Sequence, residues 1–279
     1  MISAGPHQEM IEEILRQPGV KYYVTTFPGM REFEAAKKML DELALDYQII
    51  MPEERYARVA KPALAMSKET RGMLLTEKAD LLFCSGWVEY RPSAADTPQD
   101  APPSFADDIF GEAAIMVLAP CIAIKSKIRI TAQISGDLSE AFPYLNSEHR
   151  TAIFNAHAPY LTIKDGYRDI SMFPKRIGLA KADDLPDAWR VLEMIRCMVN
   201  DTWRRRSAIT PCHEIRTRVP ALEIYRRLPG TNCGQCGQKT CFAFAAQLYT
   251  GAAEATQCRP VFEGEFGHLQ HGLLEVCAG

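Results

Sequence analysis

The chain has 279 residues, a hydrophobic content of 47%, a charged content of 24% and a formal net charge of −3. These are ordinary values for a globular protein of about two domains, and the net charge does not favour nucleic-acid binding. No run of about 18 apolar residues predicts a transmembrane helix, and the acidic, amphipathic N-terminus lacks the pattern of a signal peptide. We therefore expect a cytoplasmic protein. Its nine cysteines, an odd number, do not indicate a secreted disulfide framework.

The first fifty residues have the pattern of a β-α-β unit. We expect a helix, a strand, a second helix and a second strand, in that order, at residues 7–17, 21–26, 32–45 and 47–51. The sequence TTF, the Glu- and Lys-rich helix and the strand that ends at Pro52 resemble small ferredoxin-like carrier domains. Those domains often have a cysteine in the next loop, where this chain has PALAMS. The resemblance therefore implies a fold and not a thiol carrier.

The next region contains further helix and strand signals and one long loop. The sequence predicts a helix at residues 68–79, a strand at 80–90 and a buried strand at 113–118. Residues 91–103 contain four prolines, and a loop of this length is either functional or an irregular link. We interpret it as a surface insertion.

From residue 127 the pattern changes to that of an α+β unit of about 80 residues. Asp165-Gly166 is typical of a type I′ hairpin turn and predicts that the strands on either side of it pair. The strands are expected at residues 127–134, 152–154, 160–163, 168–173 and 176–180.

Two helices accompany these strands. Asp137 followed by Glu140 is a variant of the capping box, which predicts a helix that starts at Asp137. Asp183 or Asp184 is the expected N-cap of a long helix at residues 185–205. The apolar residues of this helix that we expect to be buried are Trp189, Leu192, Ile195, Val199 and Trp203.

These elements indicate an α+β protein with three parts. The first is an N-terminal α/β domain at residues 1–120, for which the resemblance suggests a ferredoxin-like fold. The second is the α+β domain at residues 121–206. The third, residues 207–279, consists of a connector and a small domain of short helices and loops.

The connector and the C-terminus contain secondary candidates for chemistry. Cys212 and His213 are either ligands for a second metal or redox site, or connector residues with a buried thiol. Cys277, preceded by two histidines, is either a metal ligand or part of a loose tail. We interpret three further cysteines with apolar neighbours as core residues: Cys84, Cys121 and Cys197. The arginines before the cysteine-rich stretch form either a basic docking surface or a solvated helix end: Arg204, Arg205, Arg206, Arg216, Arg218, Arg226 and Arg227.

Four cysteines near the C-terminus have the spacing C-x2-C-x4-C-x16-C and predict a metal site. They are Cys233, Cys236, Cys241 and Cys258. Structural zinc sites usually have two close pairs of ligands, whereas here three cysteines share one short loop and the fourth is distant. The order x2 then x4 also differs from the plant-type [2Fe–2S] run. The spacing therefore favours a [4Fe–4S] cluster, with another iron–sulfur form and zinc as the alternatives.

The residues between these cysteines support a cluster. Gly234 and Gly237 each follow a cysteine, and glycine permits the positive φ angles that let a backbone wrap closely around a group. Cys241 is expected to open a helix, whose N-terminal charge would stabilise a thiolate, and Gly251 is expected to end that helix.

The pattern PGxNCGxCGxxTCxxFAxxLxxG…C resembles the four-cysteine [4Fe–4S] domain of the corrinoid iron–sulfur protein large subunit and of the Rnf complex B subunit. The resemblance covers about 35 residues and implies that the four cysteines bind the cluster and that the cluster passes low-potential electrons. In this chain Arg259 separates the last cysteine from its proline, which removes no ligand. Upstream, DLSEAFPYLN, KADD and PALEIYRRLPGTNCG resemble a family of anaerobe iron–sulfur proteins without an assigned activity.

Motifs for catalysis are absent from the sequence: we find no nucleotide, flavin, radical-SAM or hydrolase signature. We therefore expect an electron-transfer or accessory protein rather than an enzyme. The resemblance implies reductive activation of a partner metalloenzyme or corrinoid protein in an anaerobic cytoplasm. The alternative is an accessory protein for metallocluster assembly or maturation, with a structural or transferable cluster. The upstream residues are too few for a barrel and a corrinoid domain, since a barrel alone takes about 250 residues.

Overall fold

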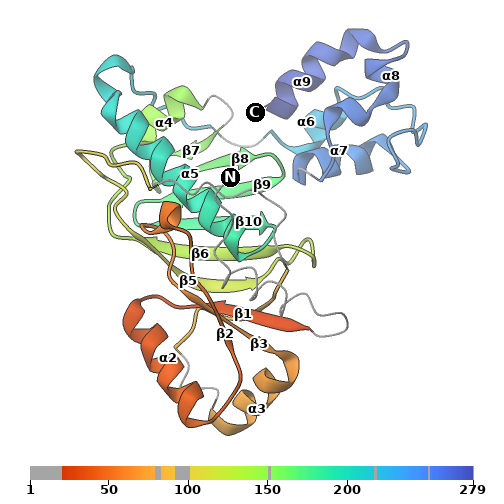
Figure 1. Ribbon diagram of the computed structural model, residues 1–279. Helices are drawn as coiled ribbons and strands as arrows, with labels where there is room; N and C mark the ends of the chain where they lie inside the picture. Colours follow the sequence, from red (N-terminus) through yellow and green to blue (C-terminus); the bar gives the residue numbers. More distant parts are fainter. Residues whose placement is uncertain are drawn as a thin grey trace.

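The computed structural model describes residues 21–78, 83–91, 101–149, 152–216, 219–250 and 252–278. These residues form two antiparallel sheets, helices that cover them, and a C-terminal group of short helices, which confirms the α+β class (Figure 1). The helix expected at 7–17, most of the proline-rich loop and the helix stop at Gly251 lie outside the described residues. No helix of the described residues is both long and apolar enough to cross a membrane.

The N-terminal sheet has the strand order β2-β3-β1-β4, and every neighbouring pair is antiparallel. This order and the alternation of strands and helices correspond to the ferredoxin-like split β-α-β arrangement. The elements are β1 (Tyr22–Thr26), α2 (Met30–Glu42), β2 (Gln48–Ile50), the 3₁₀ turn η1 (Glu54–Tyr56), β3 (Ala63–Ser67), α3 (Lys68–Lys78) and β4 (Val88–Glu89).

Strand β3 was not expected from the sequence, which assigned PALAMS to a loop. The strand is buried on both sides, so its residues do not alternate between apolar and polar. Leu64 and Met66 share a core with Phe33 and Leu40 of α2. Ala63 belongs to the core on the other side of the sheet. The strand expected at 80–90 is shorter than predicted, because within the described residues only Val88–Glu89 pair with β1.

The second sheet has six antiparallel strands in the order β5-β6-β10-β9-β8-β7. The strands are β5 (Ala113–Pro120), β6 (Ile128–Ile134), β7 (Ile153–Asn155), β8 (Tyr160–Asp165), β9 (Arg168–Phe173) and β10 (Arg176–Ala182). Strand β5 precedes the boundary predicted near residue 120 but pairs with β6 along most of its length. We therefore propose that the boundary between the two sheets lies before Ala113.

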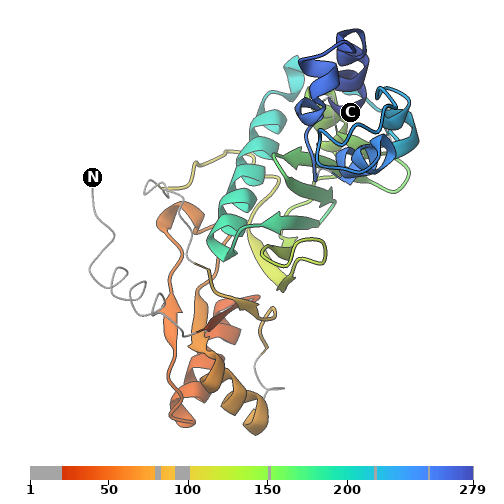
Figure 2. The ribbon, with the colours of Figure 1, turned by 90° about the vertical axis from the view of Figure 1, so that its right-hand side faces the viewer.

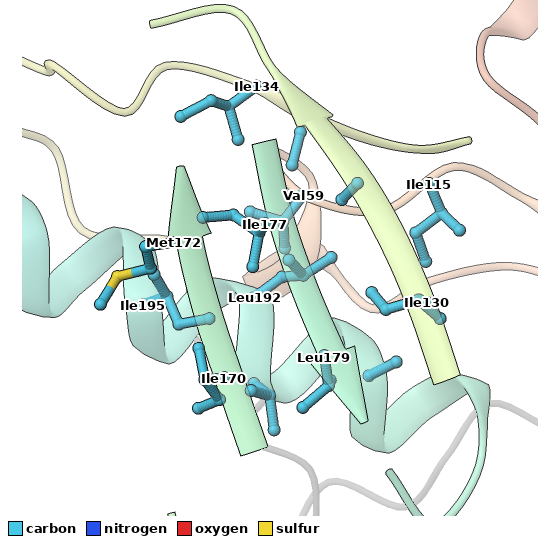
Figure 3. Packing of buried hydrophobic residues seen from close by; sticks show 14 of the residues in the cluster. Val59, Ile115, Ile130, Ile134, Ile170, Met172, Ile177, Leu179, Leu192 and Ile195 are labelled. Carbon is cyan, nitrogen blue, oxygen red and sulfur yellow. The ribbon is translucent and has the colours of Figure 1, made fainter. Parts of the chain in front are cut away.

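Helix α5 (Leu185–Arg204) covers one face of this sheet, and its N-cap is Asp184, whose side chain accepts a hydrogen bond from the backbone N–H of Asp187 at 2.8 Å. The predicted residues Trp189, Leu192, Ile195 and Val199 are buried, and Trp203 is partly buried against the same core. Figure 3 shows Leu192 and Ile195 among the apolar side chains of β6, β9 and β10. Val59, from the N-terminal part of the chain, points into the same cluster, so one core joins the two sheets.

Two local predictions in this region were wrong in detail. Helix α4 (Phe142–Glu148) starts five residues after Asp137, with Pro143 in its first turn. The Asp137 carboxylate instead accepts the N–H and the hydroxyl of Ser139, which closes a turn. The β8–β9 hairpin forms as predicted, but in its two-residue loop Gly166 has a φ of +57° and Tyr167 is not left-handed, which fits a type II′ turn.

The C-terminal segment, residues 219–278 without Gly251, is a group of short helices with a core of its own. Its elements are α6 (Ala221–Tyr225), α7 (Cys241–Thr250), η4 (Ala255–Gln257), α8 (Arg259–Phe262), η5 (Gly267–Leu269) and α9 (Gln270–Ala278). The connector before it contains the 3₁₀ turn η3 (Arg206–Ala208) and a bridge between Arg216 and Phe154 of β7. The segment lies beside the face of the sheet that α5 leaves open (Figure 2).

Lys181, in a bulge of β10, links the sheet to this C-terminal segment. Its φ is +66°, which is unusual for a residue with a side chain, and 8% of its surface is exposed. Its Nζ lies 2.9 Å from a carboxylate oxygen of Asp169 and donates to the backbone carbonyl of Thr250, at the end of α7, at 3.1 Å.

Candidate metal centre

The four cysteines of the motif line one hollow in the C-terminal segment. Cys233 and Cys236 lie in the loop between α6 and α7, Cys241 is the first residue of α7, and Cys258 lies directly before α8. The hollow contains about 290 Å³ of space that protein atoms do not fill, part of it open to solvent. Its other lining residues are Pro229, Thr231, Asn232, Gly234, Gln238, Phe244 and Pro260. The fold thus brings Cys258, which is distant in the sequence, close to the three cysteines of the short loop.

Two glycine turns shape the loop that contains the first two cysteines. Gly234 has a φ of +74° and Gly237 a φ of +79°, as the sequence predicted. The N–H of Gly237 donates to the carbonyl of Gly234 at 2.9 Å, which closes the turn around Cys236. Residues with a Cβ adopt such angles at a cost, so glycine after each cysteine lets the chain curve tightly around the hollow.

The four thiols differ in their exposure. Cys241 and Cys258 are 8% and 5% exposed and belong to the core of the segment, together with Phe244 and Val261. Cys236 is half-buried, and Cys233 is exposed. A group bound by all four would therefore have one side against the core and one side close to solvent.

The thiols around the hollow are close enough to affect one another's titration. Burial raises the pKa of the Cys258 thiol, and the charges of Cys236, Cys241 and Cys233 raise it further. The backbone N–H of Gln235 donates to Cys233 and lowers the pKa of that thiol, with a smaller contribution from the Thr231 hydroxyl, although burial opposes both. Four thiolates this close together repel one another, which costs free energy unless positive charge lies between them. A metal centre supplies that charge.

The four thiols are a donor set that an iron–sulfur cluster can use. Within the described residues, no three His, Cys, Asp or Glu side chains are close enough together to coordinate a single ion. The four cysteines nevertheless surround one hollow. In an iron–sulfur cluster each cysteine binds a different iron atom, so the ligands lie farther apart than the four ligands of a zinc ion do. The donor set, four thiols with no carboxylate or imidazole lining the hollow, is also the one that clusters use.

Cys212 and His213 have structural surroundings. The N–H of Cys212 donates to the carbonyl of Pro143, and its own carbonyl accepts from the side-chain amide of Asn146, both at 2.9 Å. The Cys212 sulfur lies 3.5 Å from Arg216 Nη2, and His213 is exposed. The backbone of Cys212 thus holds the connector against α4, as expected of a connector residue.

Cys277 does not lie in a loose tail, contrary to one expectation from the sequence. Helix α9 places Leu273 and Val276 in the core of the segment, and Cys277 packs against that core. Burial raises the pKa of its thiol. Of the three cysteines predicted to be core residues, Cys121 is buried, whereas Cys84 and Cys197 are half-buried.

The arginines before the motif are largely paired with acidic side chains. In the described part of the chain, Arg205 contacts Glu148 and Asp201, Arg206 contacts Asp107, and both Arg226 and Arg227 contact Glu223. Arg216 donates to the backbone carbonyls at 146 and 149 instead. Arg218 lies outside the described residues. These pairs favour the interpretation as solvated and structural residues over a continuous basic docking surface.

The structure adds one residue to the site that the sequence analysis did not single out. Asn232 precedes the first cysteine, has a φ of +51°, and accepts a hydrogen bond from the backbone N–H of Cys241 at 2.8 Å. The sequence could have indicated this role of Asn232, because asparagine is the non-glycine residue best suited to both left-handed angles and helix N-termini.

Known proteins are similar to a small part of the chain only. A family model described as "Putative Fe-S cluster" matches residues 228–260. Over 40 residues the chain is 52% identical to the acetyl-CoA decarbonylase/synthase complex subunit gamma 2 of Methanosarcina thermophila, which covers 14% of this chain and 8% of that protein. Over 40 residues it is 54% identical to the corrinoid/iron-sulfur protein large subunit of Moorella thermoacetica, a stretch that covers 14% of this chain and 9% of that protein.

A third relative matches over a longer stretch. The gamma subunit of the acetyl-CoA decarbonylase/synthase complex of Methanocaldococcus jannaschii is 44% identical over 59 residues, 21% of this chain and 12% of that protein. The chain thus spans about a tenth of the length of the curated relatives it matches, and no solved structure matches it. Residues 228–260 are therefore similar to an iron–sulfur family, and short stretches of the chain are similar to these gamma subunits and to the corrinoid/iron-sulfur large subunit.

Proposed function

We propose that Cys233, Cys236, Cys241 and Cys258 bind one [4Fe–4S] cluster, and that the protein uses it to deliver low-potential electrons to a partner metalloenzyme or corrinoid protein. The observation that carries the proposal is that all four thiols line one hollow between the loop, α7 and α8. When bound, the cluster would supply one-electron redox chemistry.

The surroundings of the four thiols suit electron transfer. Cys233 and the loop around it are exposed, so an acceptor can approach that side of the cluster closely. Cys241 and Cys258 are buried and hold the other side against the core. Backbone N–H groups directed at the sulfurs, as from Gln235 to Cys233, favour the reduced and more negative state and so tune the potential.

The names of the relatives suggest the class of partner. They are subunits of acetyl-CoA decarbonylase/synthase complexes and a corrinoid/iron-sulfur protein. The matches to these relatives cover 14% to 21% of this chain, and the described residues upstream of the motif form antiparallel sheets rather than a parallel barrel. We therefore propose that a metalloenzyme or corrinoid centre belongs to the partner, and that the protein works in an anaerobic cytoplasm, where an exposed cluster survives.

Metal analysis of the anaerobically purified protein tests the cluster. We expect about four iron and four sulfide per chain and a reversible EPR signal below about −300 mV, within the range of about −700 to +450 mV that such clusters span. Stoichiometric zinc would overturn the proposal. An intact cluster that cannot be reduced would overturn electron delivery and leave a structural role.

Single Cys→Ser variants test the ligand set. We expect each of the four substitutions to abolish or greatly reduce the iron content. Cys212→Ser and Cys277→Ser are matched controls, because these half-buried thiols lie outside the hollow, and they should leave the iron content unchanged. Full iron content after loss of one motif cysteine would instead indicate an open coordination site and would favour an enzyme.

The second candidate function is that of an accessory protein for metallocluster assembly or maturation. The exposure of Cys233 favours it, since an acceptor thiol can reach the iron bound there. Mixing the loaded protein with an apo-ferredoxin and following the visible absorbance of both separates the two functions. Transfer of the cluster within minutes would support the accessory role, and retention would support electron delivery.

A further inference from the structure

One side-chain hydrogen bond joins two of the segments that contain the proposed ligands. The side-chain oxygen of Asn232 accepts the backbone N–H of Cys241 at 2.8 Å. Asn232 directly precedes Cys233, so the bond connects the loop of the first two cysteines to the first residue of α7. It forms between protein atoms alone and does not need the cluster.

Two independent demands select asparagine at this position. The backbone φ of +51° is left-handed, and asparagine is the residue other than glycine that tolerates such an angle best. The side chain must also carry an acceptor of the right length for an N–H that has no partner within the helix. Glycine meets the first demand only, and serine or threonine would meet mainly the second.

A second capping bond at the same helix does not join the two segments. The Thr240 hydroxyl accepts the N–H of Ala243 at 3.0 Å, three residues further along the chain. Thr240 therefore caps α7 locally, as helix N-caps commonly do. The two bonds differ in what they hold: Thr240 stabilises the helix, whereas Asn232 fixes the position of the helix relative to the loop.

We propose that Asn232 is a positioning residue that holds Cys233 and Cys241 in place before the cluster binds; this inference rests on the proposed cluster. Without the bond, the loop would sample more conformations in the apo protein, and each binding event would have to order it. The bond also occupies the Cys241 N–H and so orients that amide toward the loop.

Three variants of the full-length protein separate the side-chain bond from the backbone angle and from helix capping. Asn232→Gly keeps the left-handed angle and removes the bond. Asn232→Asp keeps an acceptor in the same place. Thr240→Ala removes the local cap and leaves the bond between the segments. Because glycine is unstrained at this angle, Asn232→Gly is expected to fold.

Two readouts are measured for each variant. The first is hydrogen exchange of the Cys241 amide in the apo protein, which does not depend on the cluster. The second is the rate at which the loaded protein loses its visible absorbance in excess EDTA. For Asn232→Gly we expect both rates to rise by about 3- to 30-fold, the range that loss of a capping bond gives. We expect Asn232→Asp to restore both rates to within about 3-fold of the unchanged protein.

The outcomes distinguish this inference from the proposed function. Rates in Asn232→Gly equal to those of the unchanged protein would overturn the inference and leave the cluster standing. A loss of cluster as fast in Thr240→Ala as in Asn232→Gly would also overturn it, because helix capping would then explain the effect. An unchanged protein that binds no cluster under anaerobic reconstitution would overturn the proposed function, and the positioning role with it.

Discussion

The two sheets and the C-terminal segment are stabilised in different ways. The sheets share a large core of aliphatic side chains from both parts of the chain, in which Leu192, Ile195 and Ile177 have no exposed surface. The C-terminal segment has a much smaller core, and Cys241 and Cys258 are part of it. Apolar burial is therefore the main stabilising term for the sheets, whereas in the segment two of the proposed ligands are also core residues, so we expect metal binding and folding to be coupled there.

The largest effect that this comparison predicts follows removal of the cluster. Without it, four thiols that line one hollow lose their common partner, and a small core has to hold the short helices. We expect the backbone amides of residues 219–250 and 252–278 to exchange faster than in the loaded protein, although the Cys241 amide keeps the part of its protection that the bond to Asn232 gives, while the amides of β6, β9, β10 and α5 exchange as before. Equal loss of protection in both regions, or in neither, would contradict the comparison.

Leu192→Ala applies the opposite test, because it changes the sheets and not the segment. Leu192 is a fully buried residue of α5, and replacing a buried leucine by alanine costs about 2 to 5 kcal/mol. We expect a loss of that size in the free energy of unfolding measured with urea, and an unchanged iron content. Met116→Ala, at a side chain that is 41% exposed on β5, is the control and should change stability by less than about 0.5 kcal/mol.

Asp184→Ala tests the start of α5, which holds the larger core together. Removal of a side-chain N-cap costs about 0.5 to 2 kcal/mol. Since Asp184 Oδ1 accepts the N–H of Asp187, Asp184→Asn keeps an acceptor and should restore most of the lost stability. Thermal unfolding of the three proteins measures both changes, and an asparagine variant as unstable as the alanine variant would show that the charge matters rather than the cap.

The last expected effect is the pH dependence from a thiol outside the proposed metal site. Burial, with the nearby Glu193 carboxylate, raises the pKa of Cys197 from 9.0 to about 11. Between these values the unfolded state loses the thiol proton while the folded state keeps it, so the free energy of unfolding falls as the pH rises from about 9 to about 11 and is unaffected below that range. The urea midpoints of the unchanged protein and of Cys197→Ser, measured as a function of pH, should therefore converge or cross between about pH 9 and about pH 11. Parallel curves would contradict the assignment.

The pKa values of thiols in the two regions are thus shifted in opposite directions. Cys197 stays protonated because it is half-buried beside a carboxylate. Cys233 is exposed and receives a backbone N–H, which lowers its pKa. Metal ligation requires the thiolate, so this difference in surroundings is the one expected between a structural cysteine and a ligand.

The local patterns of the sequence predicted most of the helices and strands. Helix α5, its N-cap, the strands from β6 to β10 and the left-handed glycines after two of the cysteines were found where the residues indicated. The grouping of the four cysteines was also predicted, because their spacing carries that information without knowledge of the rest of the fold. In each of these cases neighbouring residues determine the structure.

The features that were missed depend on residues far apart in the chain. Strand β3 consists of alanine, leucine and methionine, which favour strands only weakly, and it forms because β1 and β2 pair with its two edges. Strand β5 pairs across the boundary that composition suggested. The bond from Asn232 to Cys241 spans nine residues and depends on where α7 starts.

Lys181 leads to an expectation about evolution. Lys181 adopts a left-handed angle against the conformational preference of lysine, and its ammonium group holds the end of α7 to the sheet. In descendants of this chain that lost the four cysteines, selection for that contact would be relaxed. We expect glycine or asparagine to replace the lysine there, since both adopt the same angle at lower cost. The residue at position 181 would then record whether a lineage still carries the cluster.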